Sequence, residues 1–198
     1  MREIKINPKG DNKTISNNIN NISNQIRIAI KRLNECECFM RDGSIFKQNI
    51  YEVLNYWVGN TYVGERKDDL INKEFTNFFN SLLKLLLVLK QSDKEYEEAK
   101  ALYQGKVYRV LGYYEPCEYH DLIQPEYSDF YVSWSKDENI MDVLINKLYN
   151  PITKIEAVIK NNYYGIDLEI LGVSKPNEKE VVFPTIEETI RKQTYVGL

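Results

Sequence analysis

Apolar positions in the first hundred residues follow helical spacing. On the first predicted helix, over residues 15–33, they recur every three or four residues: Ile19, Ile22, Ile26, Ile30 and Leu33. The same spacing predicts helices over residues 45–58 and 67–90, and Asp93 is placed to cap a short helix that ends at Ala101. The N-terminal half is therefore predicted to be helical.

The pattern changes near Gln104 to short runs of β-branched and aromatic residues, which are typical of strands. These runs predict strands over residues 106–113, 129–135, 152–160, 165–171 and 180–183, with one helix over 139–148. Helices followed by strands indicate an α+β fold rather than a doubly wound sheet. We expect a helical region at 1–100 that packs on a core at 101–198 built as a mixed β-sheet or β-sandwich, either as two parts or as one integrated domain.

Composition limits the classes of function. The net charge of −3 gives no bulk attraction to nucleic acid or to an anionic membrane. Three cysteines are too few for a disulfide framework, and Cys36 and Cys38 lack a second ligand pair, so no metal site is expected. No signal-peptide core opens the chain, and the apolar run at 82–89 is too short to span a bilayer. We therefore expect a cytoplasmic protein.

Paired acids supply the first candidate chemistry. Glu178 and Glu180 stand two residues apart at the start of an apolar strand, where strand geometry would project both from one face. Such a pair suits proton transfer or charge stabilisation, although alone it is more often a solvated strand face. Two upstream strand-like runs carry Tyr108-Arg109 and Ser133-Trp134-Ser135. Trp134 faces away from both serines, so we expect it to pack in the core.

In this order, the three motifs resemble the mono-ADP-ribosyltransferases of the Arg–Ser–Glu class, which include bacterial toxins and phage enzymes. The resemblance covers residues 104–184. Arg109 is similar to the arginine on the family's first core strand, and Ser133-Trp134-Ser135 to its Ser-Thr-Ser strand. Residues 165–168 are similar to a Gly-Ile-Asp-Ile sequence that recurs at the start of a strand in the family. Residues 174–184 are similar to the family's target-recognition loop and Glu-x-Glu strand. The resemblance implies an ADP-ribosyltransferase-like core with NAD+ as the substrate and no metal.

The chemistry of nicotinamide–ribose cleavage assigns a role to each acidic residue. An oxocarbenium cation develops at the ribosyl carbon, and a fixed carboxylate at Glu180 would stabilise it. Ser133 would orient that carboxylate by a hydrogen bond. Glu178 would hold the acceptor and help to remove its proton. In the family, a Glu at this position goes with arginine acceptors.

The resemblance also implies a set of cofactor contacts. The planar guanidinium of Arg109 suits the pyrophosphate, because its fork of donors matches two phosphate oxygens. Ser133, Ser135 and Tyr108 complete the expected cofactor-binding set.

The sequence leaves the acceptor open. The leading hypothesis is transfer of ADP-ribose to an unknown target protein in a bacterial or host cytosol, by a toxin or effector. A second hypothesis keeps NAD+ and changes the acceptor to nucleic acid, a small molecule or water, with nucleic acid disfavoured by the acidic composition. A third is a catalytically inactive binding protein with the same fold.

Overall fold

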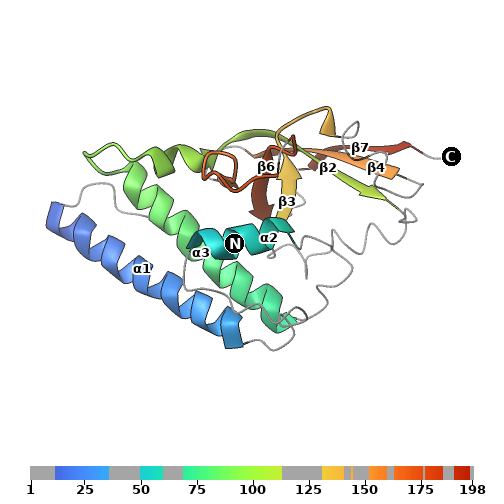
Figure 1. Ribbon diagram of the computed structural model, residues 1–198. Helices are drawn as coiled ribbons and strands as arrows, with labels where there is room; N and C mark the ends of the chain where they lie inside the picture. Colours follow the sequence, from blue (N-terminus) through green and yellow to red (C-terminus); the bar gives the residue numbers. More distant parts are fainter. Residues whose placement is uncertain are drawn as a thin grey trace. The chain divides into compact units, whose positions relative to one another are not determined.

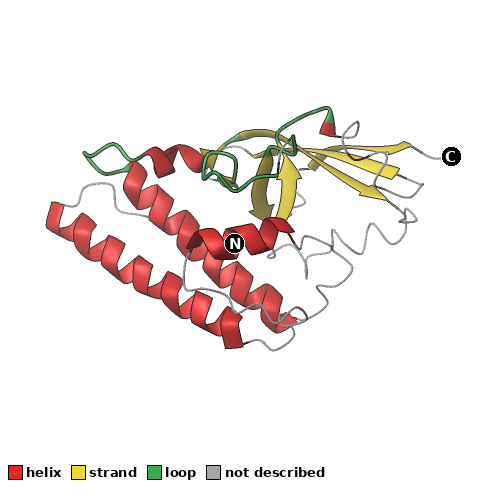
Figure 2. Cartoon of the chain, viewed as in Figure 1, coloured by secondary structure: helices red, strands yellow, loops and turns green. Residues whose placement is uncertain are grey.

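The computed structural model describes most of the chain, in these ranges: 12–35, 50–59, 69–112, 131–140, 144, 152–159, 163–175, 177–184 and 190–196. The chain divides into two compact units, Met1–Leu102 and Tyr103–Leu198. Helices make up the first unit and strands the second, which confirms the predicted α+β class (Figures 1 and 2). In the part of the chain that is described, no helix is long and apolar enough to cross a membrane.

The helical unit contains α1 (Asn12–Glu35), α2 (Ile50–Gly59) and α3 (Asp69–Lys90), which confirms the three long helices expected from periodicity. Their apolar stripes are buried, as helix amphipathicity requires. At the centre, Trp57 of α2 makes edge-on contacts with Phe75 and Phe79 of α3, at centroid distances of 4.9 and 4.7 Å. These aromatic contacts join α2 to α3.

The short helix after α3 differs from its prediction. It is a 3₁₀ helix, η3 (Glu97–Ala101), and it begins after Tyr96 without a side-chain cap. Asp93 therefore does not cap it, and that prediction is wrong. A turn follows α3 instead, where the backbone N–H of Lys94 donates to Ser92 Oγ at 3.2 Å.

The second unit is built on a seven-stranded sheet in the order β1-β5-β6-β3-β2-β4-β7. The strands are β1 (Leu102–Tyr103), β2 (Gly105–Gly112), β3 (Tyr131–Ser135), β4 (Ile152–Ile159), β5 (Gly165–Asp167), β6 (Glu180–Pro184) and β7 (Ile190–Val196). The ladders among the six strands β2 to β7 are all antiparallel, which corrects the predicted mixed sheet for these strands. The helix predicted over 139–148 lies mostly outside the described residues, as do Cys36, Cys38 and Cys117.

Three strands depart from the sequence analysis. β1 and β7 were not predicted, and β7 pairs with β4 from the Ile152–Val196 pair onwards. β5 ends at Asp167 instead of residue 171, because the Asp167 carboxylate starts a turn: Oδ1 accepts the backbone N–H groups of Glu169 at 3.0 Å and Ile170 at 3.2 Å. Side-chain capping of this kind competes with continued strand pairing.

The sheet has two distinct faces. One carries the main apolar cluster, whose buried members are Val107, Trp134, Ile155, Ala157, Ile159, Val181 and Phe183. Burial of Trp134 in this cluster confirms that it packs in the core. Because side chains alternate along a strand, the opposite face carries Tyr108 and Val110 of β2, which pack with Ile140. We call these the Trp134 face and the Tyr108 face.

Candidate functional site

The strand order brings the three sequence motifs next to one another. β6, which starts at Glu180, pairs with the serine strand β3, and β3 pairs with the Arg109 strand β2. Ser135 is opposite Glu180 on one side and opposite Tyr108 on the other. Residues that face each other across a ladder share a face, so Ser135, Glu180 and Tyr108 all lie on the Tyr108 face.

Ser133 and Glu180 form the central contact of the site. Ser133 lies on the same face as Ser135, two residues away along β3. Its Oγ donates a hydrogen bond to Glu180 Oε1. Glu180 is only 3% exposed, so this hydrogen bond fixes a carboxylate that is almost wholly removed from water. The structure therefore brings together Ser133 and Glu180, as the sequence predicts.

The backbone of Glu180 is held on both sides. Its N–H donates to Ser174 Oγ at 3.0 Å, and its carbonyl accepts the N–H of Leu168 at 2.9 Å. With the contact from Ser133, three separate segments restrain this one residue. Such restraint preorganises a side chain, because its rotamer and backbone are set before any ligand binds.

Glu178 lies outside the strand that begins at Glu180. Lys179 between them adopts a φ of 42°, and Asn177 a φ of 67°, both in the left-handed region. Regular alternation therefore does not reach Glu178, and the expected projection of both acids from one strand face is wrong. The turn is fixed from β3 instead, where Ser135 Oγ donates to the Glu178 carbonyl at 2.7 Å.

Ser135 has a different role from Ser133. Its hydroxyl also accepts the backbone N–H of Asp137 at 2.9 Å, and the residue is 4% exposed. Both hydrogen-bonding directions of this oxygen are thus used within the protein. The structure places Ser135 under the Glu178 turn, and its predicted contact with a cofactor stays a prediction.

Arg109 lies on the other face of the sheet. Its ladder partner is Ile155 of β4, a member of the core cluster on the Trp134 face. Among the described residues, β2 and β3 share one ladder pair, Tyr108–Ser135, and Arg109 is the next residue beyond it. The structure thus brings the strand of Arg109 to the site, while its side chain projects from the face opposite Glu180.

Tyr108 shares a face with Glu180 but is a core residue there. It is 4% exposed and packs with Val110 and Ile140. The ammonium group of Lys154 lies 5.0 Å from its ring centroid, within cation–π range. A cofactor contact by Tyr108 likewise stays a prediction.

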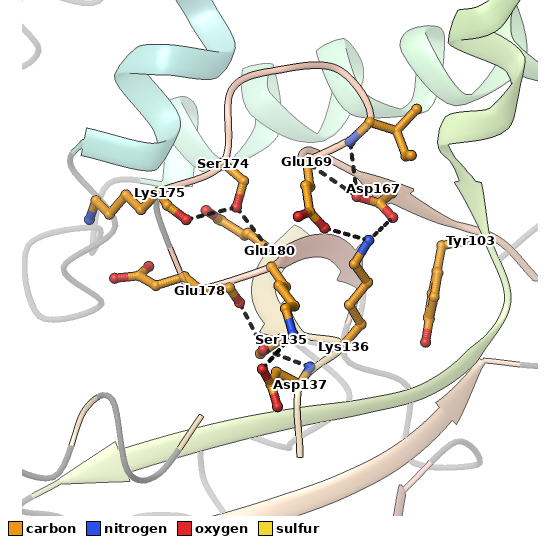
Figure 3. Close-up of polar contacts among 12 residues, drawn as sticks. Tyr103, Ser135, Lys136, Asp137, Asp167, Glu169, Ser174, Lys175, Glu178 and Glu180 are labelled. Atoms are coloured by element: carbon orange, nitrogen blue, oxygen red, sulfur yellow. Dashed lines mark hydrogen bonds and ion pairs between the residues drawn. The ribbon is translucent and has the colours of Figure 1, made fainter. Parts of the chain in front are cut away.

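Three residues around the acids were given no role of their own in the sequence analysis. Lys136 bonds to two carboxylates on the β5 side, Asp137 Oδ2 lies 2.8 Å from Lys179 Nζ, and Ser174 binds the Glu180 backbone (Figure 3). The hydrogen bond from Lys179 lowers the pKa of Asp137. The signal that could have found Lys136 and Asp137 is their position directly after the serine motif.

The chemistry available here is that of a fixed, buried carboxylate at Glu180, with a second acid, Glu178, two residues earlier on a turn whose carbonyl is bound by Ser135. Among the described residues, no group of three or more His, Cys, Asp or Glu side chains is arranged to hold a metal ion. Comparison of the chain with protein-family models, curated proteins and solved structures finds no match.

Proposed function

We propose that this chain is a mono-ADP-ribosyltransferase with an ADP-ribosyltransferase-like core, which cleaves the nicotinamide–ribose bond of NAD+ and transfers ADP-ribose to a protein side chain, with arginine favoured. The hydrogen bond from Ser133 to the buried Glu180 carboxylate carries the proposal. A carboxylate that is already oriented needs no reorganisation when positive charge develops on the ribose. Burial strengthens that interaction, because the local dielectric is low.

The reaction divides between the two acids. The bond from the ribosyl carbon to nicotinamide breaks, and nicotinamide leaves with the electron pair. Glu180 faces the oxocarbenium cation, and the acceptor then attacks the same carbon. Glu178, on its turn outside β6, takes the proton that the acceptor loses. The position of Arg109 on the other face adds no support to this scheme, so its contact with the pyrophosphate stays a prediction.

The test measures nicotinamide release and label transfer from NAD+ labelled in its ADP-ribose part, with purified protein and a cell lysate. We expect Glu180→Gln to lower both by about 100-fold or more, the range for loss of a preorganised electrostatic contact. Glu156→Gln is the matched control. Glu156 lies on the same face, opposite Tyr108, and pairs with Lys106 at 3.3 Å, away from the acids.

Several results would contradict the proposal. Equal release by the wild type and Glu180→Gln would remove Glu180 from the chemistry. Binding of NAD+ without turnover would favour the inactive binding protein. Release without transfer would favour a glycohydrolase, and a nuclease-sensitive product would move the acceptor to nucleic acid.

A further inference from the structure

Lys136, the residue directly after the serine strand, connects three strands near Glu180. Its Nζ lies 2.6 Å from Asp167 Oδ2 and 2.8 Å from Glu169 Oε2 (Figure 3). Its backbone N–H donates to the carbonyl of Lys179 at 3.1 Å. Since β6 lies between β3 and β5 in the sheet, the lysine side chain bridges from one neighbour of β6 to the other.

The Asp167 carboxylate links Lys136 to the turn that binds the Glu180 backbone. Its Oδ2 binds Lys136, and its Oδ1 accepts two backbone N–H groups of the following turn. The next residue, Leu168, donates its N–H to the Glu180 carbonyl at 2.9 Å. The position of the Asp167 carboxylate therefore sets the start of the turn that binds the Glu180 backbone.

Burial distinguishes this ion pair from the ordinary surface pairs of the chain. The side chains of Lys136 and Asp167 are 21% and 5% exposed, whereas Lys100 and Glu97, also 2.6 Å apart, are 64% and 81% exposed. Loss of one partner from a desolvated pair leaves an uncompensated charge, while loss from an exposed pair has little effect. Lys100 is thus a matched control for Lys136.

The hydrogen bond from Leu168 N–H to the Glu180 carbonyl links the turn after Asp167 to the backbone of Glu180. Asp167 is opposite Val181, a member of the cluster on the Trp134 face. Its carboxylate therefore lies across the sheet from that of Glu180.

We propose that Lys136 is a positioning residue for Glu180, acting through the Asp167 carboxylate and the Leu168 N–H. The proposal rests on NAD+ cleavage at Glu180 as the proposed function. Lys136→Met keeps much of the aliphatic stem and removes the charge. We expect its kcat for nicotinamide release to fall about tenfold or more, with KM for NAD+ within about threefold, because a loss of geometry at the reacting carbon affects the transition state more than binding.

A second measurement does not depend on activity. Hydrogen exchange at the Leu168 amide reports the bond to the Glu180 carbonyl, and we expect Lys136→Met to speed it about tenfold or more by local opening. Lys136→Arg should restore most of the kcat and the slow exchange. Lys100→Met should change neither quantity.

The outcomes separate the two proposals. A wild type that does not cleave NAD+ overturns the proposed function, while Leu168 exchange still tests the role of Lys136. Unchanged Leu168 exchange in Lys136→Met, or equal effects from Lys100→Met, overturns the positioning role. If Lys136→Met does not fold, the double variant Lys136→Met, Asp167→Asn takes its place. It removes the unpaired charge and keeps an acceptor for the turn. The same changes in kcat and in Leu168 exchange are expected of it, and unchanged Leu168 exchange would again overturn the positioning role.

Discussion

The two serines of the β3 motif differ in the groups that their hydroxyls bind. Both lie on the Tyr108 face, and both belong to the cofactor-binding set predicted from sequence, with Ser133 alone expected to orient Glu180 as well. Ser133 donates to the carboxylate of Glu180, whereas Ser135 donates to the carbonyl of Glu178 and accepts from the N–H of Asp137. One hydroxyl therefore orients a functional group, and the other supports the turn beside it.

Arg109 offers the sharpest test of a single residue. Its side chain projects from the Trp134 face, whereas a cofactor site shared with Glu180 would need it on the Tyr108 face. If it binds the pyrophosphate as predicted, Arg109→Ala should raise KM for NAD+ about tenfold or more, since a charge-assisted hydrogen bond contributes roughly 1.5–3 kcal/mol. Its kcat should change less. Steady-state kinetics of nicotinamide release measure both. An unchanged KM with a lower melting temperature would instead assign Arg109 to packing on the Trp134 face.

The packing of β5 in the core depends on Gly165, which has no side chain. A Cβ built on Gly165 would lie 2.6 Å from Val181 Cγ1 and 3.0 Å from Ile159 Cδ1. Gly165 thus allows β5 to approach both β6 and β4 side chains in the core. Larger residues in such tight sites force neighbouring side chains out of their rotamers.

Gly165→Ala should therefore lower the free energy of unfolding by about 1–3 kcal/mol, through overpacking. Gly172→Ala is the matched comparison: it meets nothing within 4 Å, and its cost comes from a φ of +74°. That cost should be about 1 kcal/mol, the usual penalty for alanine in the left-handed region. Denaturant titration of both variants measures the two values. A smaller loss for Gly165→Ala than for Gly172→Ala would contradict the steric argument.

The sequence predicted most elements of this fold, because periodicity reports which face of an element is buried. It could not predict that β6, β3 and β2 lie side by side, since strand order depends on long-range pairing. The break at Lys179 was also hidden, because a lysine with positive φ carries no local signal. The face of Arg109 required the register with β4, which spacing along β2 does not supply.

For the whole molecule, the sheet unit should set the alkaline limit of stability. Burial raises the pKa of Tyr131 and of Tyr103, whose hydroxyl also donates to the Lys106 carbonyl at 2.8 Å. For Lys136, burial lowers the pKa, but the hydrogen bonds to Asp167 and Glu169 outweigh it, so the net shift is upward. All three groups bind their proton more tightly in the folded state.

A raised folded pKa gives stability that is complete below the unfolded pKa, about 10 for Tyr and 10.4 for Lys, and is lost as the pH rises through the folded value. We therefore expect the melting temperature to be flat from pH 8 to about pH 10 and to fall above it. Circular dichroism melts measure this, and tyrosine absorbance at high pH should show ionisation that coincides with unfolding. Tyr131→Phe should weaken the fall, because it removes a phenol whose pKa is raised by burial. A wild type and a Tyr131→Phe variant that lose stability in parallel above pH 10 would show that Tyr131 ionises without cost to the fold.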